Sequence, residues 1–183
     1  MHTRRKSIFL VVLGFCLAWV SPCWAESPPT CNSADIIDIA THDNGITHTP
    51  LGVSGNGDLI VRIEGLRNTN GYVQVLLFNH AEDYPIHADG VYRMHTLLFK
   101  SQVIECRFNN IPLGDYALAV IHDENANYEL DLGLLGIPSE GVTASNGAKG
   151  FFGPPQWKDA KFLMDTPQYN VTLKMHYGIS YWI

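Results

Sequence analysis

The sequence predicts an all-β protein, an antiparallel Greek-key β-sandwich that is preceded by a signal peptide. Short runs of alternating apolar and polar residues recur along the chain, turn residues separate them, and no run has the spacing of a long amphipathic helix. Strands of this kind bury their apolar faces by packing in two layers. We divide the chain into a signal peptide, residues 1–25, a loosely ordered N-terminal extension, residues 26–57, and a β-sandwich domain, residues 58–183.

The first 25 residues have the organisation of a secretory signal peptide. Basic residues at positions 4–6 precede the apolar run Ile8–Val20, and the small residue Ala25 follows at a position suited to cleavage. The apolar run has 13 residues, whereas a membrane-spanning helix needs about 20. We therefore expect export to the periplasm or the extracellular space, cleavage near Ala25, and no integral membrane span after processing.

The charge of the chain narrows the choice of partners. The whole chain has a formal net charge of −6, and removal of the signal peptide leaves 9 Lys and Arg against 18 Asp and Glu, which is −9. The remaining basic residues are scattered between Arg62 and Lys174, and an acidic surface repels phosphate backbones. We expect no nucleic acid partner, and an unidentified ligand or envelope protein instead.

The strands are predicted from residue 59 onward. Residues 26–57 are rich in turn formers and carry one short apolar patch, Ile36 to Ile39, which indicates a loosely held extension. Residues 59–64 and 72–78 alternate on either side of a turn, as expected of two adjacent strands. Residues 91–99 fit either a strand or a short helix.

The second half of the chain predicts four further strands. They cover residues 103–108, 116–121, 160–164 and 169–177. Before the second of them, Leu113, Gly114 and Tyr116 have the pattern of a tyrosine corner, in which the phenol hydroxyl bonds to backbone a few residues upstream. This motif is typical of Greek-key sandwiches of the immunoglobulin type.

The segment that follows this turn resembles a known family. The run IPLGDYALAVIHDENANYELD, residues 111–131, is similar to the secreted bacterial family known as Domain of Unknown Function 2141. Further motifs continue the resemblance in the same order, at residues 136–141, 145–146 and 153–162. The resemblance covers about residues 58–176. It implies a small exported β-sandwich, similar in outline to prealbumin-like modules, with no established activity.

Oxygen-bearing residues at alternate positions suggest a calcium loop within this run. Their spacing follows the first ligands of an EF-hand-like loop, with a backbone carbonyl in the fourth place. The twelfth position is Leu134 rather than a bidentate Glu, and Glu140 is the nearest acid that could substitute. We predict weak, structural Ca²⁺ binding; the alternative is that the side chains cap their own backbone in Asx turns. The predicted ligands are Asp123, Asn125, Asn127, Glu129 and Asp131, with Glu140 as an additional ligand.

His122 offers a hypothesis from another functional class. A small hydrolase or transferase could use His122 with Asp123 or Glu140, and with Ser139 or Ser145 as the nucleophile. The chain has no Gly-x-Ser-x-Gly nucleophile elbow. We therefore favour a binding or structural module and assign no catalytic residue.

Aromatic residues form a second candidate ligand site. Phe151, Phe152 and Trp157 lie on a Gly- and Pro-rich segment that cannot be a regular strand. If they are exposed, they would bind a ligand together with His122; if they are buried, they would plug the open end of the sandwich.

Two cysteines remain after cleavage, Cys31 and Cys106. Because the exported chain meets an oxidising compartment, we predict a disulfide between them that ties the extension to the sandwich. The alternative is a buried Cys106 and a free Cys31.

Overall fold

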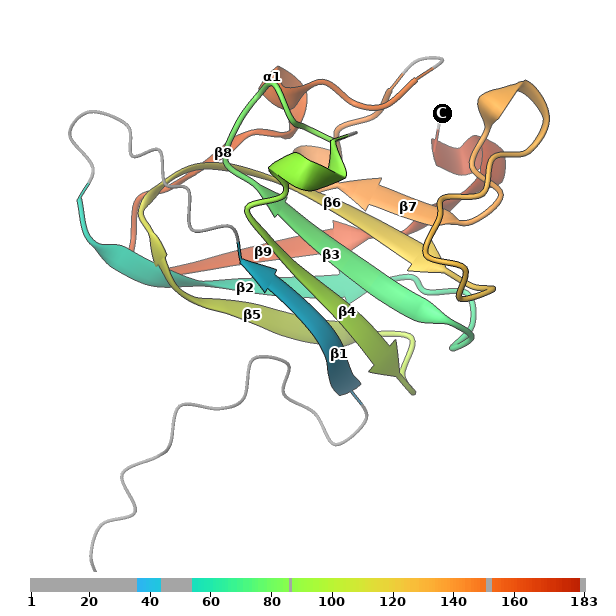
Figure 1. The fold of residues 1–183 in the computed structure, drawn as a ribbon, viewed down its shortest axis with the longest axis horizontal. Helices are drawn as coiled ribbons and strands as arrows, with labels where there is room; N and C mark the ends of the chain where they lie inside the picture. Colours follow the sequence, from blue (N-terminus) through green and yellow to red (C-terminus); the bar gives the residue numbers. More distant parts are fainter. Residues whose placement is uncertain (1–35, 44–53, 86, 151–152, 182–183) are drawn as a thin grey trace, which may run out of the picture.

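The computed structural model describes residues 36–43, 54–85, 87–150 and 153–181. Within these residues the chain forms two β-sheets that pack face to face (Figure 1). Most strand pairs are antiparallel, and the pair β2–β9 is parallel. No helix in this part of the chain is long and apolar enough to cross a membrane. The predicted all-β class is confirmed at the level of two antiparallel-rich sheets.

The larger sheet has seven strands in the order β1-β4-β3-β6-β7-β10, and β8 pairs with β6 beside β7. Its strands are β1 (Ile36–Asp43), β3 (Tyr72–Phe78), β4 (Arg93–Phe99), β6 (Gly114–Asp123), β7 (Gly141–Ala144), β8 (Phe162–Met164) and β10 (His176–Tyr177). The smaller sheet has the order β5-β2-β9. Its strands are β2 (Asn56–Glu64), β5 (Ile104–Pro112) and β9 (Gln168–Lys174).

Short helical turns connect some of these strands. The one α-helix of the described residues is a single turn, α1 (Trp157–Ala160). The 3₁₀ turns are η1 (Ala88–Gly90), η2 (Leu134–Gly136), η3 (Ser145–Gly147) and η4 (Gly178–Tyr181).

The main core lies between the two sheets and is built from the period-two rows that the sequence shows. Alternate side chains of a strand point to the same face, so β2 buries one row and β3 buries the row that faces it. Fully buried members of these rows are Leu59, Val61, Ile63, Val73, Val75 and Leu77. Cys106 of β5 is buried in the same core.

Two expectations need correction. Residues 59–64 and 72–78 are strands, but β2 belongs to the smaller sheet and β3 to the larger one, so the turn between them carries the chain across the core. Alternation identifies a strand without naming its partner. The extension is also more ordered than predicted at residues 36–43, because they form β1, which pairs with β4 from Ile36–Phe99 to Asp43–Arg93.

The structure decides two further expectations. Residues 91–99, predicted as strand or helix, contain the strand β4. The tyrosine corner is confirmed, since the Tyr116 hydroxyl donates a hydrogen bond of 2.7 Å to the Pro112 carbonyl. Burial raises the pKa of Tyr116, with Tyr92 as a further cause, so the hydroxyl keeps its proton and remains a donor.

Candidate functional site

The end of β6 places two polar side chains on opposite faces of the larger sheet. Because successive side chains of a strand alternate, His122 points to the core between the sheets and packs edge-on against Phe99 of β4. Asp123 then lies on the outer face, at the start of the loop 124–140. Both side chains are fully buried.

Asp123 organises the first turn of the loop. Its Oδ1 accepts a hydrogen bond from the Asn127 backbone N–H at 3.1 Å, and its Oδ2 accepts one from the Tyr128 N–H at 2.6 Å. Ala126 and Tyr128 have positive φ angles of 60° and 65°, and this curvature turns both N–H groups toward the carboxylate. A buried charge that accepts backbone N–H bonds in this way holds a turn that the chain alone would disfavour.

The two asparagines of the loop cap backbone in the same manner. Asn125 Oδ1 accepts from the Asn127 N–H at 3.1 Å, and Asn127 Oδ1 accepts from the Glu129 N–H at 2.8 Å. Both are Asx turns. Their side-chain amides donate toward the Asp131 carboxylate, Asn125 at 2.6 Å and Asn127 at 3.4 Å.

Glu140 closes the loop from its far end. Its Oε1 accepts from the Glu124 N–H at 2.9 Å and its Oε2 from the Asp131 N–H at 3.2 Å. One carboxylate therefore ties the first and the last turn together, and its side chain is 4% exposed. The Ser139 hydroxyl adds a bond of 3.0 Å to the Asp131 carbonyl.

An ion pair braces the loop against the neighbouring turn. Arg67 donates to both carboxylate oxygens of Glu124, through Nε at 2.8 Å and through Nη2, and Asn68 donates to the same carboxylate. Partial burial acts to raise the pKa of Glu124, but the hydrogen bonds from Arg67 and Asn68 outweigh it, and this pKa lies below its usual value. The Arg67 Nη2 also reaches the Ser139 carbonyl at 3.3 Å.

The oxygens that were predicted as calcium ligands are thus mostly engaged with backbone. Asp123, Asn125, Asn127 and Glu140 accept N–H bonds, and Asp131 receives amide N–H donors. Among the described residues, no group of three or more His, Cys, Asp or Glu side chains is placed to hold a metal ion. The Asx turns of the alternative reading are present, and Ca²⁺ binding stays a prediction.

Both ring nitrogens of His122 take part in a hydrogen-bond chain. Its Nε2 lies 2.9 Å from the Asn70 carbonyl, and its Nδ1 lies 2.7 Å from the Tyr177 hydroxyl. A carbonyl can only accept, so Nε2 carries a proton and donates to Asn70; in the tautomer with the proton on Nε2 alone, Nδ1 accepts from Tyr177. Burial raises the pKa of Tyr177, which keeps its hydroxyl protonated for this role. Gly141 makes room for the contact, because a Cβ there would lie 2.5 Å from the Tyr177 ring.

The serines of the hydrolase hypothesis bond elsewhere. The Ser145 hydroxyl is fully buried, donates to the Ala160 carbonyl at 2.6 Å and accepts from the Leu118 N–H at 2.8 Å. Ser139 bonds to Asp131. His122, whose two nitrogens are engaged with Tyr177 and Asn70, is therefore not brought together with either serine.

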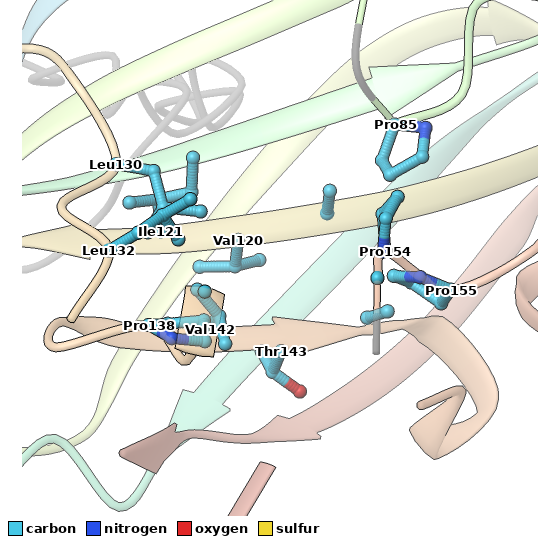
Figure 2. Close-up of a pocket in the computed structure, with 14 residues that line it drawn as sticks. Pro85, Val120, Ile121, Leu130, Leu132, Pro138, Val142, Thr143, Pro154 and Pro155 are labelled. Atoms are coloured by element: carbon cyan, nitrogen blue, oxygen red, sulfur yellow. The ribbon is translucent and has the colours of Figure 1, made fainter. Parts of the chain in front are cut away.

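An open apolar groove of about 450 Å³ lies on the outer face of β6 and β7 (Figure 2). The outward-facing side chains of β6 explain the groove. Ala117 is buried in a second apolar cluster, whereas Ala119 and Ile121 are half-buried and line the groove. The buried members of this second cluster are Phe78, Tyr84, Val91, Ala117, Ala144, Ala148 and Ala160. Leu130 and Leu132 of the loop stand at one end and Pro154 at the other (Figure 2). Of the 14 described residues that line the groove, Thr143 alone has a polar side chain.

The predicted aromatic site is not part of the groove lining as far as it is described. Trp157 is half-buried, begins α1 and packs edge-on against Tyr84 at 5.9 Å, beside the second apolar cluster. Phe151 and Phe152 lie outside the described residues, as do Cys31 and the signal peptide.

Sequence reasoning missed the groove, the Arg67–Glu124 pair and the role of Tyr177. A signal for the groove was present, because every residue from Tyr116 to Ile121 is apolar, as in a strand that is covered on both faces. The calcium prediction depends on the acids and amides of the loop, whereas two of its leucines line the groove. Nothing local marks Arg67 or Tyr177, whose partners lie 57 and 55 residues away.

The fold and the site together define a two-sheet β protein with an uncharged groove on one outer face. One wall of the groove is a loop whose conformation is stabilised by hydrogen bonds from its backbone N–H groups to carboxylates. The model of a family described as an uncharacterized protein conserved in bacteria, Domain of Unknown Function 2141, matches residues 61–172. The chain belongs to this family. No curated protein and no solved structure shows significant similarity to this chain.

Proposed function

We propose that this protein is an exported binding module that holds a neutral, apolar ligand in the groove on β6 and β7. The observation that carries the proposal is the groove itself, which is open, about 450 Å³ in volume and lined almost wholly by apolar side chains. Ligand pockets of roughly 300 to 1,000 Å³ with few polar groups are typical of small-molecule sites.

The loop 124–140 supports the proposal because its own hydrogen bonds hold it in place beside the groove. The carboxylates of Asp123 and Glu140 each fix two backbone N–H groups, and the Arg67–Glu124 pair holds the loop to the neighbouring turn. A preformed wall loses little conformational entropy when a ligand binds. The apolar lining gives no place for a charged group, so the buried part of the ligand is neutral.

A neutral fluorophore tests the groove directly. We expect N-phenyl-1-naphthylamine to bind the purified mature protein with a saturable rise in fluorescence. Leu132→Asp should weaken this binding by at least about tenfold, because it sets a charge in the wall of an apolar site. The parent side chain is 60% exposed, so the fold tolerates the change.

Leu163→Asp is the matched control, since Leu163 of β8 is 42% exposed and does not line the groove. It should bind the fluorophore like the unaltered protein. Absence of saturable binding, or equal losses in the two variants, would contradict the groove as the ligand site.

Export and the disulfide belong to the same proposal. We infer cleavage near Ala25 and a periplasmic or extracellular location, supported by the charge pattern of residues 1–25. We also infer a Greek-key connection of the strands, supported by the tyrosine corner at Tyr116. We expect the intact mass of the exported protein, alkylated under denaturing non-reducing conditions, to correspond to a chain that begins at Glu26 and carries no label. Two labels per chain would rule out the Cys31–Cys106 bond, and a retained N-terminus would rule out cleavage.

We also propose a structural Ca²⁺ ion in the loop 123–131. Among the hydrogen bonds described, the Asp131 carboxylate accepts from side-chain amides and from no backbone N–H. Binding would require Asp123 or Glu140 to exchange backbone donors for the ion. This exchange limits the affinity to the weak range of extracellular modules, about 10⁻⁴ to 10⁻³ M.

A further inference from the structure

The groove continues into an exposed apolar turn at the tip of the loop. Leu132 and Pro138 pair across a single β-bridge, and both line the groove. Between them the 3₁₀ turn η2 presents Leu134 and Leu135, which are 85% and 75% exposed. In Figure 1 this orange loop between β6 and β7 projects beyond the sheets. The tip and the wall of the groove are therefore one continuous apolar surface.

The backbone of the tip is set to display these side chains. Leu135 has φ = 64°, a left-handed conformation that is uncommon for residues other than Gly, Asn and Asp. Backbone bonds hold the turn in this state, from the Gly133 N–H to the Ile137 carbonyl at 2.7 Å and from the Ile137 N–H to the Leu134 carbonyl at 3.4 Å. Strain of this kind persists where the surroundings enforce it and is often found at functional sites.

The charge around the tip indicates which surface it contacts. No charged side chain occurs from Leu132 to Ser139, while Glu129 and Asp131 precede this stretch and the mature chain is acidic. A nucleic acid or an acidic partner would be repelled. An uncharged apolar phase bounded by neutral headgroups would accept the leucines without a charge to desolvate.

We propose that the Leu134–Leu135 turn is a contact for a neutral lipid surface, and that the ligand of the adjoining groove is an acyl chain taken up from that surface. The inference rests on the proposed function of the groove. A groove of about 450 Å³ lies within the range of small-molecule sites, roughly 300 to 1,000 Å³, and its apolar lining suits an acyl chain. Contact at the tip lets such a chain pass from lipid to groove without crossing water.

Cosedimentation with phosphatidylcholine vesicles tests the contact. The variant L134S/L135G removes both exposed side chains, and glycine suits the positive φ at position 135, so the fold is retained. We expect the unaltered mature protein to sediment with the vesicles and the double variant to partition at least about tenfold more weakly. I179S, which alters an isoleucine that is 65% exposed in η4, should leave the partition unchanged. Vesicles with added anionic lipid should bind less protein at low salt.

The fluorophore separates this inference from the proposed function. In lipid-free buffer, L134S/L135G should bind N-phenyl-1-naphthylamine like the unaltered protein, because the groove is intact. Fluorophore binding without vesicle binding would overturn the lipid contact and leave the groove; absence of fluorophore binding would overturn the proposed function. Equal vesicle losses in I179S and L134S/L135G would overturn the assignment to this turn. A dimer that the double variant converts to a monomer in sedimentation equilibrium would mark a self-association surface and overturn it as well.

Discussion

Asp123→Ala is expected to destabilise the protein by about 3 kcal/mol. Asp123 is fully buried, and its two carboxylate oxygens accept the backbone N–H groups of Asn127 and Tyr128. Alanine removes both hydrogen bonds, and a hydrogen bond to a charged group contributes about 1.5 to 3 kcal/mol. Urea unfolding at neutral pH in the presence of EDTA measures the difference.

Glu129→Ala is the matched control for this variant. Glu129 is an exposed acid of the same loop, and in the calcium hypothesis it contributes only a backbone carbonyl. Its loss should change the free energy of unfolding by less than about 0.5 kcal/mol. Equal effects of the two substitutions would contradict the role of Asp123 as a buried cap.

The same titration decides the calcium proposal when it is repeated in about 10 mM Ca²⁺, some tenfold above the weakest constant expected for such modules. A structural ion would stabilise the unaltered protein by about 1.4 kcal/mol and would give Asp123→Ala no such gain. Equal stability in Ca²⁺ and in EDTA would leave the Asx turns as the complete description of the loop.

His122→Ala is expected to cost about 3 kcal/mol of stability as well. The ring is fully buried, packs edge-on against Phe99 and bonds to Asn70 and Tyr177. Removal leaves a cavity in the core and takes away the hydrogen-bond partner of the Tyr177 hydroxyl and of the Asn70 carbonyl. A loss of this size would establish the structural role of the ring.

Tyr177→Phe calibrates this result. It removes the hydroxyl that bonds to His122 and to the Arg67 N–H, and should cost about 2 kcal/mol, because each of these two hydrogen bonds typically contributes about 1 kcal/mol. Because the residues share a bond, the double variant His122→Ala/Tyr177→Phe should cost less than the two single losses together. Additive losses would contradict the hydrogen-bond chain, and an unchanged stability in His122→Ala would remove the structural role of His122.

The sequence by itself determined the features that depend on near neighbours. Alternation located β2, β3, β5, β6, β8 and β9, because a period of two needs only adjacent residues, whereas β4 was left open between strand and helix and β7 was not predicted. The tyrosine corner joins Tyr116 to Pro112, four residues away. The turn chemistry of Asn125 and Asn127 is equally local, since each caps an N–H two residues ahead.

The tertiary structure decided everything that needed distant partners. Alternation could not show that the chain crosses from one sheet to the other between β2 and β3. Residues 36–43 form a strand through their pairing with β4, which lies far away in the sequence. Arg67, Glu140 and Tyr177 acquired their roles from residues that folding brought beside them. The groove arose in the same way, because β6 has two apolar faces and only packing decides how much of the outer one is covered. Local patterns reflect the energies of a few neighbouring bonds, whereas partners and cavities depend on how the whole chain buries its apolar surface.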